Sequence, residues 1–354
     1  MVLSSITYNK PLITQLNIQE FLNQSQGHLT LDVRSEGEYE YGHILHATNL
    51  PLFNNEERKI IGTAYKQQGK NEAILLGLDY VGKKMSEFVR FVQPKLKDNK
   101  VFVHCWRGGM RSGSMAWLLS LFGYEVYVLK GGYKAYRQHV LQRIGEKYKL
   151  VVIGGKTGSG KTDILMKLKE LGEQVIDLEA LANHKGSAFG ALGLPAQPST
   201  EHFENMLAEK MEHFDLNKRV WVEDESKSVG RVILDLNLWQ NMRASPVFVI
   251  ELPLEVRLQR LVRDYGHQSI TGLEEAITNI KRRLGNEQWK SAIDAVRAKD
   301  FAGAAKITLY YYDKAYDKGL SMKETKEIFR FTFETDDMER IARSLKAAAQ
   351  EKGY

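Results

Sequence analysis

The chain has 354 residues, a hydrophobic fraction of 43%, 29 glycines and 7 prolines, a composition that indicates a globular protein and excludes a disordered or fibrous one. Its 50 Lys and Arg residues exceed its 44 Asp and Glu residues, a mild positive charge that is compatible with a polyanionic partner and is also common among soluble enzymes. The chain has no apolar run of the roughly 20 residues that span a membrane, no signal-peptide pattern and only one cysteine, which fits a reducing compartment, so we expect a cytoplasmic protein that does not bind membranes.

Short β-branched segments alternate with longer helical patterns, which predicts parallel sheets with crossover helices. In the first part of the chain we expect helices within 54–95 and after Ser112, and strands at 29–34, 101–105 and 126–132. A charged helix follows, and we place a domain boundary inside it. The predicted domains are residues 1–140 and 141–354.

The second part repeats the alternation. We expect strands at 149–155, 174–179, 219–225 and 246–253. Residues 193–200 have the composition of a loop, and from about residue 255 onward the pattern becomes helical.

The only cysteine, Cys105, ends a predicted buried strand, and a predicted helix starts about seven residues later. The amino end of a helix offers unpaired N–H groups and a positive dipole, which favour a thiolate. Arg107 and Arg111 add positive charge, and a lowered pKa makes cysteine a nucleophile at neutral pH. Gly108 and Gly109 allow backbone amides to form an anion-binding nest. The loop is therefore predicted to activate a sulfur atom and to hold an oxyanion beside it.

The stretches "LDVRSEGEYEYGHILHATNLP" (31–51) and "VHCWRGGMRS" (103–112) resemble the rhodanese family. The resemblance implies that Cys105 carries sulfur or selenium and that Asp32 and Arg34 brace the loop. Because Arg111 stands six positions after the cysteine and not five, as is usual in small rhodaneses, the segment also fits the HC-x5-R pattern of cysteine-dependent phosphatases. Phosphate, thiophosphate and selenophosphate all remain candidate ligands of this wider loop.

A second anion-binding motif, "GKTGSGKT", follows the predicted strand at 149–155 and precedes a helical segment, which is the context that a P-loop requires. Its glycines let the backbone wrap a phosphate chain at a helix amino end, Lys161 supplies a charge, and the Thr162 hydroxyl is a candidate Mg²⁺ ligand. The predicted phosphate-binding residues are Gly155, Lys156, Thr157, Gly158, Ser159, Gly160, Lys161 and Thr162.

Two charged groups accompany the P-loop. Glu223, Asp224 and Glu225 end a predicted strand in the manner of a Walker B segment, where they would orient Mg²⁺ or water, or they form a solvated strand end. Arg257, Arg260 and Arg263 recur at three-residue spacing along a predicted helix, where they would hold phosphates, contact RNA or form a solvated face.

A rhodanese-like segment followed by a P-loop segment resembles the tRNA 2-selenouridine synthase family over nearly the whole chain, including "IGTAYKQQGKNEAILLGLDYV" (61–81), "LKGGYKAYR" (129–137) and "DLEALANHKGSAFG" (177–190). The resemblance implies an α/β fold, with a rhodanese-like parallel-sheet domain followed by a P-loop NTPase-like α/β domain with a helical C-terminal region.

The implied activity replaces sulfur by selenium in 2-thiouridine at the wobble position of tRNA, with selenophosphate as donor. The resemblance also implies that a geranyl group is first transferred from geranyl diphosphate to that sulfur. The implied partners are the thiolated tRNA and an enzyme that produces selenophosphate. Phe189, Leu192 and Leu194 are candidates to contact the geranyl chain.

Two other functions fit the same residues. One is a P-loop kinase or ATPase with an attached phosphatase or sulfurtransferase module that acts on small molecules. The other is a non-catalytic tRNA-binding protein.

Overall fold

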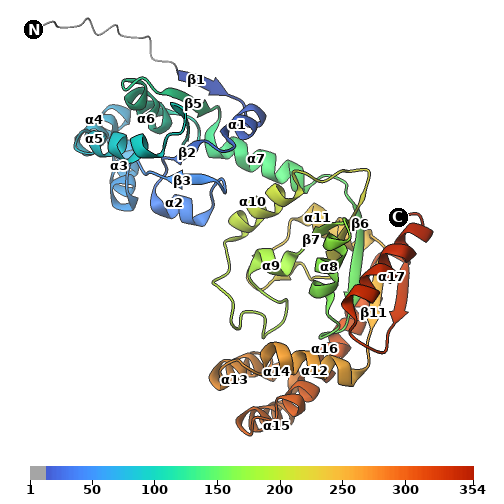
Figure 1. Ribbon diagram of the computed structural model, residues 1–354. Coiled ribbons are helices and arrows are strands. Elements are labelled where there is room, and N and C mark those ends of the chain that lie inside the picture. Colours follow the sequence, from blue (N-terminus) through green and yellow to red (C-terminus); the bar gives the residue numbers. More distant parts are fainter. Residues whose placement is uncertain (1–12) are drawn as a thin grey trace, which may run out of the picture. The chain divides into compact units, whose positions relative to one another are not determined.

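A computed structural model describes residues 13–354. The chain divides into two compact units, one ending at Gln142 and one running from Arg143 to Tyr354 (Figure 1). No helix among the described residues is long and apolar enough to cross a membrane. The first twelve residues, in which we expect no signal peptide, lie outside the described part of the chain.

The first unit is built on a five-stranded parallel sheet with the strand order β1-β5-β4-β2-β3. Its strands are β1 (Ile13–Leu16), β2 (Leu29–Asp32), β3 (Ala47–Asn49), β4 (Lys100–His104) and β5 (Glu125–Leu129). Its helices are α1 (Ile18–Ser25), α2 (Glu36–Tyr41), α3 (Asn55–Gln67), α4 (Lys70–Gly82), α5 (Met85–Val92), the 3₁₀ turn η1 (Gln93–Lys95), α6 (Met110–Ser120) and α7 (Gly132–Ile144).

The three strands predicted in this unit are confirmed as β2, β4 and β5. β1 and β3, which have four and three residues, were not predicted from the sequence. The predicted helix after Ser112 is α6, which begins two residues earlier, at Met110. Because the sheet is parallel, the residues that follow β2 and β4 meet at one edge, with Asp32 opposite His104.

The second unit contains a five-stranded parallel sheet with the order β12-β11-β6-β8-β7, and a separate two-stranded antiparallel sheet. Its strands are β6 (Lys149–Gly155), β7 (Gln174–Ile176), β8 (Arg219–Glu223), β9 (Ser228–Val229), β10 (Val232–Ile233), β11 (Val247–Glu251) and β12 (Ile328–Thr332). Its helices are α8 (Lys161–Glu170), α9 (Leu178–Ala182), α10 (Thr200–Met211), α11 (Leu236–Ala244), α12 (Leu254–Tyr265), α13 (Ile270–Asn279), α14 (Lys281–Leu284), α15 (Asn286–Arg297), α16 (Phe301–Ser321) and α17 (Met338–Glu351).

Apolar side chains of α8 and α17 pack on the central strands, around the fully buried Trp221 and Phe248. The four strands predicted in this unit are confirmed as β6, β7, β8 and β11. The helical region predicted after residue 255 is present, but it also contains β12, which was not predicted and which pairs in parallel with β11. Phe329 and Phe331 of β12 lie against Phe248, so tertiary packing fixes this strand.

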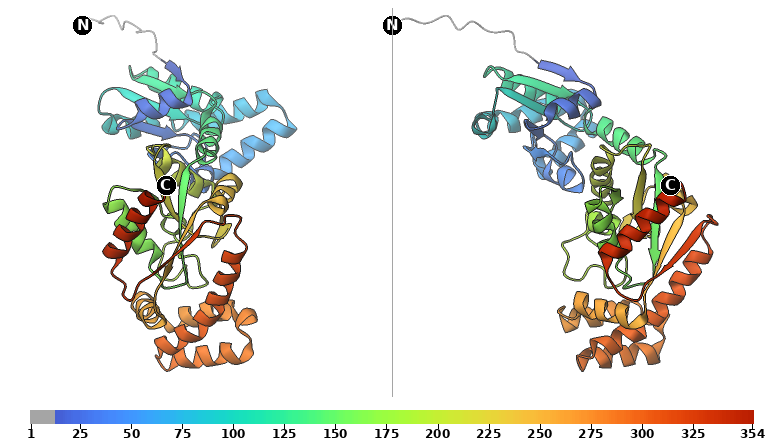
Figure 2. Two further views of the ribbon diagram at one scale, coloured as in Figure 1. Left: turned by 90° about the vertical axis from the view of Figure 1, so that its right-hand side faces the viewer. Right: turned by 45° about the vertical axis from the view of Figure 1, so that its right-hand side comes forward.

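Helices α13, α15 and α16 form a second, smaller core beside the sheet (Figure 2). Leu273, Ile277, Ile293, Val296 and Ala304 are buried within it. The fold class predicted from the sequence is confirmed: two α/β units with parallel sheets, the second followed by a mainly helical region.

Candidate active sites

The Cys105 loop connects the carboxyl end of β4 to the amino end of α6. The Sγ atom of Cys105 lies 3.2 Å from the Oγ of Ser112, and the backbone amides of Ser112 and Arg107 also donate to it. Burial raises the pKa of the Cys105 thiol, but these hydrogen bonds and the charge of Arg111 outweigh it and bring the pKa below its ordinary value. The loop thus stabilises the thiolate form of Cys105.

The residue before the cysteine, His104, is completely buried. Burial lowers the pKa of His104 to about 4, against the opposing charge of Asp32, so its imidazole is neutral at physiological pH. Asp32 pairs instead with Arg34, whose Nη2 lies 2.6 Å from Oδ2 and whose guanidinium stacks 3.6 Å above the ring of Tyr133. The charges of Asp32 and Arg34 therefore compensate each other in the interior of the first unit.

Two glycines let the backbone behind the cysteine approach closely. Gly108 and Gly132 have φ values of +65° and +60°, and a Cβ on Gly132 would lie 2.3 Å from the carbonyl oxygen of Cys105. The amide of Tyr133 donates to that same oxygen over 2.8 Å, so the first turn of α7 supports the loop from behind.

The two arginines of the loop have different surroundings. Arg111 is bound by Glu38 of α2, with Nη1–Oε2 and Nη2–Oε1 distances of 2.7 and 3.3 Å, whereas Arg107 is exposed. The Cys105 side chain is only 3% exposed. A reagent therefore reaches Sγ only when the loop or the neighbouring side chains move.

Replacing Ser112 with Ala removes one hydrogen bond to the thiolate, so we expect the pKa of Cys105 to rise by about one unit. The ultraviolet absorbance of the thiolate, followed against pH, measures this shift without interference from other thiols because the chain has one cysteine. Ser114→Ala, an exposed serine of the same helix, is the matched control. An unchanged titration curve in Ser112→Ala would show that the hydroxyl does not stabilise the thiolate.

The P-loop connects β6 to α8, and its backbone depends on glycine. Gly155, Gly158 and Gly160 have φ values of +150°, +83° and +77°, and a Cβ on Gly160 would meet the guanidinium of Arg260. The Nζ of Lys161 donates to the carbonyl oxygen of Gly155 at 3.2 Å. The loop and its lysine are thus held at the amino end of α8, the position that suits a phosphate chain.

A group of carboxyl groups faces the P-loop. The Thr162 hydroxyl donates to Glu179 over 3.1 Å, and Glu179 and Glu225 hydrogen-bond to each other. Glu223 is buried, accepts from the amide of Glu179 and leaves its Oε2 without a partner. Burial, together with the neighbouring carboxyl groups, raises the pKa values of Glu179, Glu223 and Glu225. Asp224 differs, because Lys323 pairs with it at 2.6 Å.

The α12 arginines do not form one face. Arg257 and Arg260 are each 5% exposed, whereas Arg263 is exposed to solvent. Arg257 binds Asp313 through both terminal nitrogens, at 2.9 and 2.7 Å, and also donates to the carbonyl oxygen of Thr157. Arg260 pairs with Asp163 and Asp336. A solvated face is therefore wrong for Arg257 and Arg260, whose charges are compensated by carboxylates.

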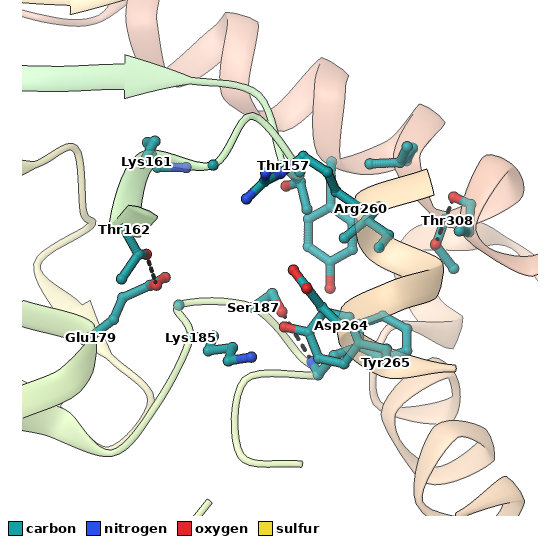
Figure 3. A pocket seen from close by; sticks show the side chains of 18 of the residues that line it. Thr157, Lys161, Thr162, Glu179, Lys185, Ser187, Arg260, Asp264, Tyr265 and Thr308 are labelled. Carbon is teal, nitrogen blue, oxygen red and sulfur yellow. Dashed lines mark hydrogen bonds between the residues drawn. The ribbon is translucent and has the colours of Figure 1, made fainter. Parts of the chain in front are cut away.

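A cavity of about 1000 Å³ starts at the P-loop and extends toward the helical region (Figure 3). Lys161, Thr162 and Glu179 lie on one side of it, opposite Arg260 and Tyr265. The polar part is lined by Gly155, Thr157, Gly158, Gly160, Lys161, Thr162, Glu179, Asp224, Glu225 and Arg260. The apolar part, which we call the apolar arm, is lined by Phe189, Leu194, Leu261, Leu273, Ile277, Val296, Phe301, Ala304, Ala305 and Leu309.

Several residues proposed from the sequence lie away from this cavity. Lys156 pairs with Asp317 at 3.1 Å, and Ser159 is fully buried inside the loop. Leu192 packs in the helical core. No individual role was predicted for Glu38 or Glu179, although Glu38 follows Ser35 at the spacing of a helix capping box.

The two loops define a class of protein: a rhodanese-type cysteine loop fused to a P-loop α/β domain. A family described as rhodanese-like domain matches residues 17–139, and the tRNA 2-selenouridine synthase AAA domain matches residues 148–351. The chain belongs to the tRNA 2-selenouridine synthase family, a family of enzymes.

The similarity to named members of this family extends over both units. The tRNA 2-selenouridine synthase of Shewanella sediminis is 34% identical, over 86% of this chain and 91% of its own. Those of Shewanella halifaxensis and Sulfurovum sp. are each 33% identical, over 86% and 85% of this chain and 92% and 91% of theirs.

Proposed function

We propose that this chain replaces sulfur by selenium in the wobble 2-thiouridine of tRNA, in two steps that use the two loops separately. The second unit transfers a geranyl group from geranyl diphosphate to the sulfur. The Cys105 loop then handles selenium from selenophosphate. Family membership supports the overall reaction, and the shape of the P-loop cavity supports the first step.

The observation that carries the geranyl step is the continuity of the cavity. Its polar part contains a P-loop, and its apolar arm is lined by side chains of α12, α13, α15 and α16. Geranyl diphosphate has the same division, since it joins two phosphates to a branched hydrocarbon chain. Burying that chain stabilises the complex by about 0.8 kcal/mol per CH₂ group. Of the three candidates for contact with the geranyl chain, Phe189 and Leu194 line the cavity.

The chemistry of the first step follows from this orientation. The sulfur of 2-thiouridine attacks the allylic carbon that carries the diphosphate, a C–S bond forms, the C–O bond breaks, and the proton of the ring N3 is lost. Negative charge develops on the departing diphosphate. Lys161 and the amides at the amino end of α8 are positioned to stabilise that charge.

The residues beside the P-loop also fit a Mg²⁺ ion. The Oε2 atom of Glu223 is buried without a partner, and burial raises the pKa values of the Glu179 and Glu225 carboxyl groups. The described residues contain no preformed group of three His, Cys, Asp or Glu ligands. Mg²⁺ typically binds one or two protein oxygens together with substrate phosphates and water. Thr162 and Glu179 would hold it, and it would withdraw charge from the diphosphate.

The second step needs a nucleophile and an anion site. Geranylation converts the thiocarbonyl into a thioether, so the selenium of selenophosphate can attack the ring carbon while the C–S bond breaks and geranyl thiol departs. Water then cleaves the P–Se bond, which releases phosphate and leaves selenium on the ring carbon. The Cys105 loop presents two amides and the Ser112 hydroxyl to its sulfur. Such a loop suits the binding of selenophosphate beside Cys105. A covalent S–Se adduct on Cys105 would in addition need a perselenide donor or a two-electron oxidant, because selenophosphate carries selenium at the selenide level.

The test is mass spectrometry of nucleosides from thiolated tRNA incubated with the protein. Geranyl diphosphate alone should yield S-geranyl-2-thiouridine, and both co-substrates together should yield 2-selenouridine. Nucleotide turnover measured in parallel addresses the alternative. Rapid ATP hydrolysis that ignores tRNA, with no modified nucleoside, would favour a kinase or ATPase.

The apolar arm makes its own prediction. Ala305→Phe places a ring inside the arm, so we expect the KM for geranyl diphosphate to rise at least tenfold, because about 1.4 kcal/mol of lost binding has that effect. The binding of inorganic diphosphate should not change. Ala302→Phe, an exposed position on the same helix, is the control. If Ala305→Phe leaves the KM unaltered, the hydrocarbon chain does not lie in this arm.

A further inference from the structure

The guanidinium best placed to bind an anion in the Cys105 loop is already occupied by a carboxylate. Glu38 grips Arg111 through both oxygens, and its Oε2 also accepts from the amide of Ser35. Arg111 is near enough to the sulfur for its charge to stabilise the thiolate. Any anion that uses Arg111 must therefore compete with Glu38.

A second arginine, Arg58, lies near the same carboxylate oxygen. The Nε of Arg58, on α3, lies 3.6 Å from Oε2 of Glu38. Its side chain is 41% exposed, against 17% for Arg111. If Arg111 turns toward a ligand, Glu38 keeps a positive partner, so the exchange leaves no carboxylate unpaired.

From this arrangement we propose that Glu38 is a positioning residue that controls anion entry into the Cys105 loop. In the empty loop Glu38 occupies Arg111 and takes the place of the anion. A tetrahedral phosphate-type anion displaces it, and Arg58 then holds Glu38 away from the loop. For selenophosphate as the natural anion, the proposal rests on the function proposed above.

The experiment measures binding of inorganic phosphate to the full-length chain. Phosphate bound next to the sulfur opposes ionisation of the thiol and therefore lowers the thiolate absorbance. Because the chain has one cysteine, this absorbance reports phosphate bound at the Cys105 loop and does not respond to phosphate bound at the P-loop. Glu38→Gln keeps the acceptor for the Ser35 amide and removes the charge. We expect it to tighten phosphate binding by roughly five- to tenfold, the size typical of contacting charged groups.

The control variant is Glu40→Gln, since Glu40 is an exposed carboxylate of the same helix. It should leave the affinity for phosphate unchanged. If Glu38 only held the Arg111 side chain in place for the anion, removing the Glu38 charge would weaken phosphate binding. Weaker or unchanged binding in Glu38→Gln therefore overturns the proposal, as does a lack of phosphate effect in every variant.

Arg58 gives an independent check through a double-mutant cycle. Arg58→Gln should weaken phosphate binding in the natural background, because Glu38 then stays on Arg111. It should have little effect in the Glu38→Gln background, where no carboxylate remains to be held. Equal effects of Arg58→Gln in both backgrounds would show that Arg58 acts without Glu38. Selenouridine formation is not part of this readout, so a failure here leaves the proposed reaction untouched.

Discussion

Cys105→Ala is expected to abolish selenouridine formation while S-geranyl-2-thiouridine still accumulates. The variant removes the only thiol, and with it the group that the loop amides and Ser112 stabilise. Loss of a nucleophile that an enzyme depends on lowers the rate to below roughly one thousandth. The measurement is nucleoside mass spectrometry with both co-substrates present. Geranylation by the same preparation serves as the internal control for folding.

Cys105→Ser separates two roles of the sulfur. Serine keeps a hydrogen-bonding atom at the same place but is a far weaker nucleophile at neutral pH. If Cys105 carries selenium covalently, both variants lose selenation. If it only helps to bind selenophosphate, the serine variant retains much of the rate. Loss of both products in Cys105→Ala would contradict the separation of the two steps.

Lys161→Ala is expected to stop geranylation, with a fall of at least about a hundredfold in kcat/KM for geranyl diphosphate. Lys161 lies at the first turn of α8 and lines the polar part of the cavity. Its ammonium is a positive charge at the amino end of α8 that can stabilise the departing diphosphate in the proposed first step. Selenation of tRNA that already carries the geranyl group should continue, because that step uses the other loop.

The matched control is Lys156→Ala, in the same P-loop. Lys156 pairs with Asp317 on α16 and lies outside the cavity. The Lys156→Ala variant should therefore geranylate tRNA at close to the natural rate. Equal losses in the two variants would point to a general disturbance of the loop, and normal geranylation in Lys161→Ala would remove the diphosphate from this site.

The shape of both loops could be predicted because each is contained in one short stretch of sequence. The glycines, the lysine and the hydroxyl of residues 155–162 form a contiguous pattern between a strand and a helix, and local geometry fixes their arrangement. The Cys105 loop is likewise defined by the strand before it and the helix after it.

The partners of these loops could not be predicted, because they come from distant parts of the chain. Glu38 and Arg111 are 73 positions apart, and Arg257 and Asp313 are 56 apart. A run of arginines at three-residue spacing does not reveal which of them meets a carboxylate. Phe189 and Leu194 of the apolar arm were predicted, but its helical walls were missed for the same reason, since α12, α13, α15 and α16 each contribute only a few side chains to it.

The burial of two α12 arginines affects how RNA binding should depend on salt. Arg257 and Arg260 are buried and paired with aspartates, so they hold no mobile counterions that a polyanion could exchange. Only exposed cations such as Arg263 can release counterions when RNA binds. A plot of log affinity against log salt concentration should therefore be shallower than the 50 basic residues of the composition suggest.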